Sequence, residues 1–543
     1  MTDKRFVLKE LSRYKVGTFA DIIYRNALLY PNETAIKCAD ESVTFARFNE
    51  RVNALIHALT AMGAGKGDVL GIVSWNCIEY PDVYGAAMKG GFVSSPFNAR
   101  LQEGELEYLI NYSETSILFV GPELVEVVKR LRPRLGKVKH FIHFGTEPVD
   151  GMRSHRDLLD QFPNVEPEVQ PEETDPVFLF YTSGTTGVPR GALYTVDRAM
   201  DDTYRFAIAL SLEQGDKHIL IMPFFHIGGT KNFWGYFFVG GSNVVMPQIS
   251  FDPRATLKAI QDESATDIHI VATHLAAFLA LPDAGAYDLS SLKRMFYAAS
   301  PMPFELLRRG IERWGNVFLQ FYGASETGPN VTMLTRKQHG FLGGTPEEQK
   351  KLTSAGFAHI GVHVRVVDER GCDLPPGEVG EIIVSSKAVL KEWWKKPEDT
   401  GQTIVDGWVH SGDMARYDEQ GYLYIVDRKR DMIVSGGENV FPREIEEVLY
   451  THPAVHEAAV IGLPDDYWVE KVHAVIVLKE GGRATAEEII DFCKQRLARF
   501  KAPKSVEFVE ALPKSPAGKI LKRELRNKVL RGEEESVRKP GTK

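Results

Sequence analysis

The chain has 543 residues, too many for one hydrophobic core, so the sequence predicts two or more domains. Its net charge of -8 argues against a dedicated nucleic-acid-binding protein. No membrane span is expected, because no run of about 18 uncharged apolar residues occurs, and the start of the chain lacks the apolar core of a secretory signal. The widely spaced cysteines, without a CxxC pair, predict reduced, buried side chains in a cytoplasmic protein and no zinc site; they are Cys38, Cys77, Cys372 and Cys493.

The first 170 residues alternate short apolar runs with helix-length patterns, of which residues 45–62 are an example. The apolar runs predict strands, and the alternation resumes further along the chain. This rhythm indicates βα units around largely parallel sheets. The expected strands lie at residues 69–74, 117–120, 139–144, 177–181, 219–222, 268–271 and 317–322.

A segment rich in glycine and hydroxyl side chains follows the strand expected at residues 177–181. Backbone N–H groups and hydroxyls at the end of a strand can surround phosphate oxygens, so a phosphate-binding loop is predicted, with a polar turn as the alternative. The segment is not the usual P-loop, since Val188 and Pro189 stand where Lys and Ser/Thr are needed, and it lacks the three spaced glycines of a dinucleotide fingerprint. Its residues are Thr182, Ser183, Gly184, Thr185, Thr186 and Gly187.

From about residue 360 the pattern becomes rich in strands, at residues 362–367 and 381–385 and in a hairpin over 414–426. The charged residues 427–431 predict a linker or a domain edge. The last 110 residues predict a small α+β domain, in which Thr485 and Glu488 form a capping-box pattern before a helix.

Two charged residues are candidates for chemistry by their position alone. Glu326 follows an expected strand, where open α/β sheets bind ligands, and its carboxylate can hold Mg²⁺; a helix N-terminal acid is the alternative. Lys519 lies in a glycine-containing segment near the C-terminus, where a cation can bridge a carboxylate and a phosphate as charge builds up. The alternative for Lys519 is an exposed surface lysine.

These segments, in their order along nearly the whole chain, resemble the motifs of the adenylate-forming superfamily of acyl-CoA synthetases, peptide-synthetase adenylation domains and luciferases. Arg190 stands where that family usually has lysine at the end of the phosphate loop, and two alanines, Ala298 and Ala299, stand where glycines are commoner. The motif segments are residues 181–190, 224–229, 298–302, 320–327, 410–413, 427–431, 433–439 and 512–520.

The resemblance implies an α/β fold with a large N-terminal domain and a small, mobile α+β C-terminal domain. The N-terminal domain, residues 1–429, would contain mainly parallel sheets flanked by helices, plus a β-rich subdomain, and would bind ATP and the acyl group. The C-terminal domain, residues 430–543, would carry the catalytic Lys519 and turn about a hinge at Arg430, where many relatives have Asp or Lys.

The resemblance also implies a role for each motif residue. Lys519 and His226 would be catalytic, the His226 ring closing the acyl site during adenylation and moving aside for the thiol. Mg²⁺ would bind Glu326 and Thr186, and CoA would pass Gly436 and Gly437. The acyl pocket would include His226, Gly228, Asn232, Ala298 and Gly323. ATP and AMP would contact Thr182, Ser183, Gly184, Thr185, Thr186, Gly187, Arg190, Ser300, Gln320, Phe321, Tyr322, Ser325, Asp413 and Arg428.

The implied activity is that of an ATP-dependent acyl-CoA synthetase, with ATP, Mg²⁺ and coenzyme A. The expected pocket positions hold no charged residue, which favours a medium- or long-chain fatty acid or an aryl or cyclic acid over a dicarboxylate or amino acid. Alternatives are an adenylating ligase that passes the acyl group to an amine or a carrier protein, and a non-catalytic nucleotide-binding or scaffold protein. A luciferase is compatible with the fold but not favoured, and a homodimer is compatible with the sequence.

Overall fold

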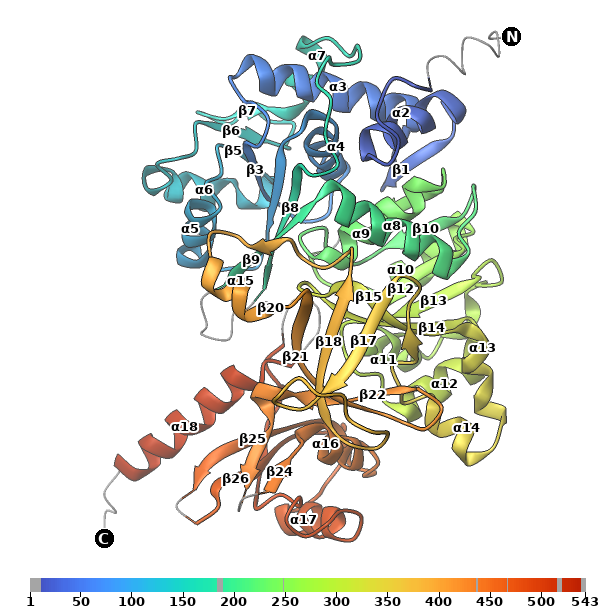
Figure 1. Ribbon diagram of the computed structural model, residues 1–543, viewed down its shortest axis with the longest axis vertical. Helices are drawn as coiled ribbons and strands as arrows, with labels where there is room; N and C mark the ends of the chain where they lie inside the picture. Colours follow the sequence, from blue (N-terminus) through green and yellow to red (C-terminus); the bar gives the residue numbers. More distant parts are fainter. Residues whose placement is uncertain are drawn as a thin grey trace.

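The computed structural model describes residues 11–182, 189–247, 249–435, 438–465, 467–514 and 520–538, the last seven of these in backbone only. In Figure 1 most segments before residue 350 form the upper body of the molecule, with the orange α15 beside β9, and the C-terminal segments from α16 to α18 lie at the bottom. Strands from residues 362 to 428 lie between the two. The predicted α/β architecture, with a β-rich part and a small C-terminal part, is confirmed.

One sheet of the upper body is parallel at its centre and antiparallel at its edges, where β16–β15, β15–β14 and β1–β2 pair. Its order is β16 (Phe357–Ala358), β15 (Gly328–Leu334), β14 (Phe318–Ala324), β13 (Arg294–Tyr297), β12 (Asp267–Ile270), β10 (Lys217–Leu220), β11 (Ser242–Val245), β1 (Thr34–Cys38) and β2 (Glu41–Thr44).

A second sheet contains the strands that the early apolar runs predicted. It is parallel from β8 to β7 and ends in antiparallel β9 and β19. The strand predicted at residues 117–120 is β5, and every residue of β3 and β5 is buried, as continuous apolar runs require. The order is β19 (Glu392–Trp393), β9 (Arg190–Thr195), β8 (Pro176–Thr182), β4 (Val93–Phe97), β3 (Val69–Val73), β5 (Ile117–Val120), β6 (His140–His143) and β7 (Arg153–Ser154).

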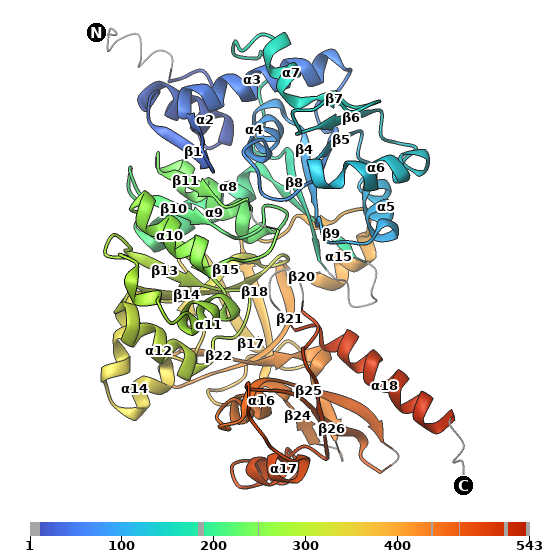
Figure 2. The ribbon, with the colours of Figure 1, turned by 180° about the vertical axis from the view of Figure 1, so that it is seen from behind.

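Helices cover both sheets and lie between them, as Figures 1 and 2 show from opposite sides. They are α2 (Phe19–Leu29), α3 (Phe45–Ala61), α4 (Tyr80–Gly90), α5 (Glu103–Tyr112), α6 (Val125–Leu131), α7 (His155–Gln161), α8 (Val196–Leu210), α9 (Ile227–Phe238), α10 (Pro253–Glu263), α11 (Ala272–Ala280), α12 (Phe304–Trp314), α13 (Arg336–His339), α14 (Pro346–Lys351) and α15 (Pro397–Thr403). Helix α3 starts at Thr44, whose hydroxyl accepts from the Arg47 N–H.

Two of these helices position the site. Helix α8 contacts β9 of one sheet and β15 of the other, and α9 packs on α8, β10 and β11. One face of α9 is apolar: Phe233, Trp234 and Phe237 are 0–1% exposed and pack among other aromatic rings. On the other face α9 approaches α8 so closely that a Cβ on Gly235 would lie 2.3 Å from the Phe206 ring.

The lower parts match the predicted β-rich subdomain and small domain. The β-rich sheet contains β17 (Val362–Val367), β18 (Gly380–Ser386), β21 (Trp408–Tyr417), β20 (Ile404–Val405) and β22 (Leu423–Arg428). The C-terminal part contains β23 (Ile433–Ser435), β24 (Glu438–Val440), α16 (Pro442–Tyr450), β25 (Val455–Asp465), β26 (Val469–Leu478), α17 (Ala486–Lys494), β27 (Ser505–Phe508) and α18 (Lys522–Arg538).

Local signals in this part are confirmed in detail. Pro442 occupies the first turn of α16, and Thr485 and Glu488 form the capping box of α17. One expectation about the cysteines was wrong: Cys372 is exposed and Cys77 is partly exposed, although Cys38 and Cys493 are buried. Cys372 lies in the connection between β17 and β18, where its N–H donates to Asp368 Oδ1 at 2.9 Å.

Candidate functional site

The β21–β22 hairpin brings Asp413 and Arg428 together. They are directly paired across the hairpin, and Arg428 Nε lies 3.0 Å from Asp413 Oδ1. Tyr322, near the end of β14, donates its hydroxyl hydrogen to Asp413 Oδ2 at 2.7 Å. Asp413, Arg428 and Tyr322 were all predicted to contact the nucleotide. They come from two different sheets, and the buried Asp413 carboxylate contacts the other two side chains.

Glu326 lies just beyond the end of β14, in the same neighbourhood. Burial raises the pKa of its carboxyl group, while the guanidinium groups of Arg428 and Arg190 favour the ionised form. Apart from its own backbone N–H, this carboxylate bonds to no other group among the residues that the structure describes. Its loop is anchored through the backbone, because Tyr194 donates to the Ser325 carbonyl at 2.6 Å and the Leu390 N–H to the Glu326 carbonyl at 3.0 Å.

Arg190 opens β9, directly opposite Thr182 at the end of β8. Its guanidinium stacks on Trp393, 4.2 Å from the ring centroid, and lies 3.7 Å from Asp399. Its Nε is buried without a hydrogen-bond partner in the described part of the chain. The guanidinium group is thus held at the start of β9, beside the end of β8. The other phosphate-loop predictions lie outside the described residues: Ser183, Gly184, Thr185, Thr186 and Gly187.

The segment after β13 contains a residue in a backbone conformation that favours glycine. Ala299 adopts a φ of 66°, a left-handed conformation that costs a residue with a Cβ about 1–2 kcal/mol. The turn places Ser300, whose N–H bonds to the Ala298 carbonyl at 2.8 Å, next to the aromatic cluster against which Ala298 packs. Nearby, the side-chain oxygen of Gln320 is buried without a partner among the described residues.

Two predicted acyl-pocket residues lie beside His269 of β12, and a third packs against the aromatic cluster that contains its stacking partner Phe296. Asn232 of α9 donates a hydrogen bond to His269 Nδ1 at 2.8 Å. A Cβ on Gly228 would lie 3.6 Å from His269 Cε1. The imidazole stacks on Phe296, 4.8 Å between centroids, and Phe296 belongs to the cluster that Ala298 contacts. The structure therefore places Gly228, Asn232 and Ala298 around one aromatic wall.

His226 and Gly323 fit the acyl-pocket prediction less directly. His226 caps the start of α9; burial first, and then the Arg100 guanidinium, lower the pKa of its imidazole to about 4, so the ring is neutral at neutral pH. A Cβ on Gly323 would lie 2.3 Å from the Gly328 carbonyl oxygen, so the β14–β15 hairpin by itself requires glycine at this position.

Charged residues of α8 and α9 beside this wall were missed by the sequence analysis. Lys231 of α9 is 8% exposed, and its ammonium lies 3.4 Å from Asp202 of α8. The pocket positions expected from the sequence are uncharged, but Lys231, between Gly228 and Asn232 in the sequence, adds a charge that those positions did not include. A charged residue inside the apolar segment of residues 227–238 was the signal that could have indicated it.

The predicted hinge lies in a short turn between the β-rich part and the C-terminal part. Arg430 is exposed there. Across this turn, Asp427 of β22 accepts a hydrogen bond from the Arg443 N–H at 2.9 Å and lies 4.0 Å from Lys522 Nζ. These contacts hold the C-terminal part against the β-rich sheet. Gly436, Gly437 and Lys519 lie outside the described residues.

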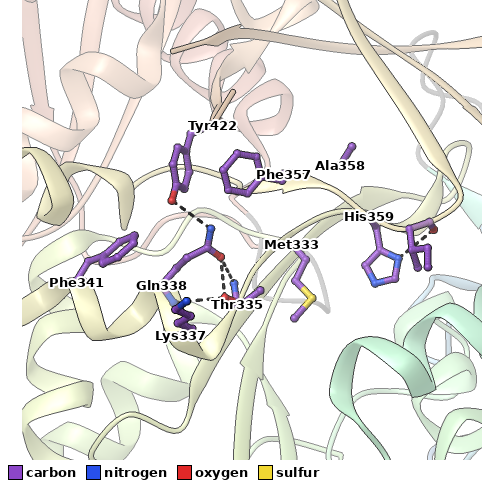
Figure 3. Close-up of a pocket in the computed structure, with 10 residues that line it drawn as sticks. Met333, Thr335, Lys337, Gln338, Phe341, Phe357, Ala358, His359 and Tyr422 are labelled. Atoms are coloured by element: carbon purple, nitrogen blue, oxygen red, sulfur yellow. Dashed lines mark hydrogen bonds between the residues drawn. The ribbon is translucent and has the colours of Figure 1, made fainter. Parts of the chain in front are cut away.

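A separate cavity of about 430 Å³ lies between β15, β16, α13 and the β21–β22 hairpin. Figure 3 shows its lining, in which Gln338 donates to the Tyr422 hydroxyl at 3.3 Å. It contains none of the predicted site residues. Its lining residues are Met333, Thr335, Lys337, Gln338, Phe341, Phe357, Ala358, His359, Ile360 and Tyr422.

Comparisons with known proteins agree with this geometry. Residues 23–394 match the family model of the AMP-binding enzyme, and residues 444–519 that of the AMP-binding enzyme C-terminal domain. No helix among the described residues is long and apolar enough to cross a membrane.

The chain is similar to a feruloyl-CoA synthase of Amycolatopsis sp, with 34% identity over 93% of this chain and 97% of the relative. A fatty acid–[acyl-carrier-protein] ligase of Streptomyces coeruleorubidus is 33% identical over 92% of this chain and 94% of the relative. The solved structure of an anthranilate CoA ligase in complex with anthranoyl-AMP has a TM-score of 0.87, with 28% identity, 97% of this chain and 99% of that chain covered. Because the family model covers well over half of the sequence, the chain belongs to the AMP-binding enzyme family within the adenylate-forming superfamily, and it is an AMP-forming ligase of the acyl-CoA synthetase type.

Proposed function

We propose that this enzyme activates a medium- or long-chain fatty acid, or an aryl or cyclic carboxylic acid, as an acyl-AMP and then transfers the acyl group to CoA. The observation that carries the proposal is the convergence of Asp413, Arg428 and Tyr322 beside Glu326 and Arg190. This grouping offers a carboxylate for ribose hydroxyls and cations for phosphate oxygens. It lies next to the aromatic wall around His269 and Ala298.

Mg²⁺ fits the donor set of this region. Glu326 offers a carboxylate whose oxygens have no side-chain partner among the described residues, and carboxylate oxygen is a preferred ligand of Mg²⁺. We assign the metal to Glu326, with the Thr186 hydroxyl as a second ligand by family resemblance. When bound, Mg²⁺ would neutralise charge on the ATP phosphates.

In the first half-reaction the acid carboxylate attacks the α-phosphorus of ATP, and pyrophosphate leaves. Asp413 holds the ribose, while Arg190 and the phosphate loop hold the departing pyrophosphate. Lys519 bridges the two reacting groups by family resemblance. The neutral imidazole of His226 covers the acyl side and limits hydrolysis of the acyl-AMP.

In the second half-reaction a CoA thiol attacks the acyl carbon and AMP leaves. We propose that residues 430–543 turn about Arg430 between the two steps, so that Gly436 and Gly437 replace Lys519 beside the acyl-AMP. The contacts of Asp427 with Arg443 and Lys522 would hold one of the two orientations. The domain boundary near residue 430, the cytoplasmic location and a homodimer stay predictions.

CoA is the acceptor that we favour, because the Gly-Gly-Glu-Asn segment at residues 436–439 resembles that of CoA ligases and the feruloyl-CoA synthase is so similar in sequence. Transfer to a carrier protein is the second candidate, since a fatty acid–[acyl-carrier-protein] ligase is a relative of almost equal identity.

The test is a pyrophosphate-release screen over fatty acids from C2 to C16 and over aromatic and cyclic acids. We expect acid-dependent release for one class, followed by thioester formation on addition of CoA. Parallel reactions with an amine and with a carrier protein in place of CoA identify the acceptor. Absence of acid-dependent pyrophosphate release across the panel would favour a non-catalytic nucleotide-binding protein instead.

A further inference from the structure

Lys231 is a buried cation whose carboxylate partner among the described residues, Asp202, is shared with other groups. Its ammonium has three N–H donors, and its polar partner among the described residues is Asp202 at 3.4 Å, longer than the 2.7–2.9 Å typical of a charge-assisted hydrogen bond. Asp202 is shared, because it also accepts from Asn330 and lies 3.6 Å from Arg205. The ammonium otherwise faces aromatic rings, 4.7 Å from the Phe206 centroid and 5.6 Å from the Phe321 centroid.

His269 presents a second buried donor, and this one has no hydrogen-bond partner among the described residues. Its Nδ1 accepts a hydrogen bond from Asn232, so the neutral ring carries its hydrogen on Nε2. Burial lowers the pKa of His269 well below its ordinary value, which keeps the ring neutral. Nε2 is buried and has no hydrogen-bond partner in the described part of the chain. A buried donor left in this state costs about 1–3 kcal/mol.

The two donors border the proposed acyl pocket. A Cβ on Gly228 would lie 3.6 Å from His269 Cε1, an ordinary contact distance, so this predicted pocket residue directly adjoins the imidazole. Lys231 follows Gly228 by almost one helical turn, and its ammonium lies over Phe321, which packs with Phe296 beneath His269. A polar end to an otherwise aromatic pocket is what recognition of an oxygen-bearing acid requires.

We propose that the acid carries a second oxygen, remote from the reacting carboxyl group, and that Lys231 and His269 donate hydrogen bonds to it. The oxygen belongs to a carbonyl, a hydroxyl or a second carboxylate; the shared chemistry is that of a hydrogen-bond acceptor. The inference rests on the proposed function, since it assumes that these residues line the acyl pocket, and it selects an oxygen-substituted acid over an unsubstituted fatty acid.

The first experiment uses the wild-type enzyme and pairs of acids that differ in this oxygen. Suitable pairs are 4-hydroxybenzoate with benzoate, 4-oxocyclohexanecarboxylate with cyclohexanecarboxylate, and adipate with hexanoate. In at least one pair, kcat/KM for pyrophosphate release is expected to be about 10–100-fold higher for the oxygen-bearing acid, and the pair concerned identifies the type of oxygen.

The second experiment removes the donors. In Lys231→Met and His269→Phe we expect the preference for the oxygen-bearing acid to fall at least tenfold. His218→Phe is the matched control: His218 is also buried, stacks on Phe296 and bonds to Asn243 Oδ1, but none of its atoms lies within 4 Å of the Gly228 Cβ position. Thermal unfolding reports whether each variant is folded. The comparison of acids with the wild-type enzyme does not depend on these variants.

The outcomes separate this inference from the function on which it rests. Pyrophosphate release without preference in any pair overturns the inference but leaves the adenylation proposal intact. Equal loss of preference in His218→Phe also overturns it, because His269 would then act only through packing. Absence of release with every acid overturns the proposed function and the inference together.

Discussion

The proposed nucleotide side and the proposed acyl side of this enzyme are built from different kinds of contact. On the nucleotide side, Asp413 is engaged at 3.0 Å by Arg428 and at 2.7 Å by Tyr322. On the acyl side, Lys231 has an ion pair of 3.4 Å, and His269 Nε2 is without a partner among the described residues. Short, paired contacts suit a ligand that never changes, whereas a long ion pair and one donor without a partner in an aromatic wall suit a ligand that differs between enzymes.

The comparison also explains where sequence motifs occur. Ribose and phosphate present the same hydroxyls and charges whatever the acid, so a carboxylate and cations that bind them are expected within short segments of fixed spacing. Binding of the acid requires a pocket of matching shape and a small number of hydrogen-bond donors. Neighbouring helices and strands can supply these in many ways. The predictions below test this contrast, beginning with the group that joins the two sides.

Lys519→Ala should lower acid-dependent pyrophosphate release by at least about 10²–10³-fold, because it removes the cation proposed to bridge acid and phosphate. Thioester formation from pre-made acyl-AMP and CoA should be largely retained. Lys514→Ala is the control, since Lys514 belongs to the same motif and is paired with Glu457. An equal loss in both half-reactions would contradict the two-orientation mechanism.

Asp413→Asn should raise the KM for ATP about 10–100-fold, because a charged hydrogen-bond partner of Arg428 and of the ribose is lost. The KM for the acid should change much less. Arg416→Ala, at an exposed position of the same strand, controls for general effects on β21. An equal rise in the KM for ATP and the KM for the acid would contradict the assignment of Asp413 to the nucleotide side alone.

Glu326 should give pyrophosphate release an acid limb at a pH above the ordinary pKa of a glutamate. Burial raises the pKa of this carboxyl group, so protonation removes the metal ligand as pH falls, with about a tenfold loss per pH unit below that pKa. Mg²⁺ competes with the proton, so saturating Mg²⁺ should move the limb to lower pH. A pH profile unaffected by the Mg²⁺ concentration would count against Glu326 as the ligand.

Gly228→Ala and Gly229→Ala, neighbours on α9, should have opposite effects on stability. The first adds a methyl group at ordinary contact distance from His269 and gains up to about 1 kcal/mol of helix propensity. The second places a Cβ 2.2 Å from the Pro223 carbonyl oxygen and should lose about 1–3 kcal/mol. Thermal unfolding measures both.

The same pair of variants also tests the acyl side by activity. Gly228→Ala narrows the space beside His269, so it should lower kcat/KM for the bulkiest acid that is accepted and leave the KM for ATP unchanged. An equal effect on small and large acids would place Gly228 outside the pocket.

The sequence alone determined the family and the fold class, and it predicted the residues of the proposed nucleotide side. Periodicity predicted β5 at residues 117–120, and the capping box predicted the start of α17, because these signals are local. Asp413 and Arg428 were found because their motifs are short and fixed in spacing, although only the β21–β22 pairing shows that the two side chains touch.

Only the tertiary structure showed the contacts of the proposed acyl side, including those of His269 and Lys231, which no motif had indicated. His269 lies on β12 and Asn232 on α9, and Lys231 and Asp202 come from adjacent helices, so no spacing along the chain predicts these contacts. A lone lysine in an apolar helix could equally have been a surface residue. The burial of Lys231 and its contacts make it a candidate recognition group. Both depend on how the helices pack between the two sheets, and a sequence pattern does not contain that information.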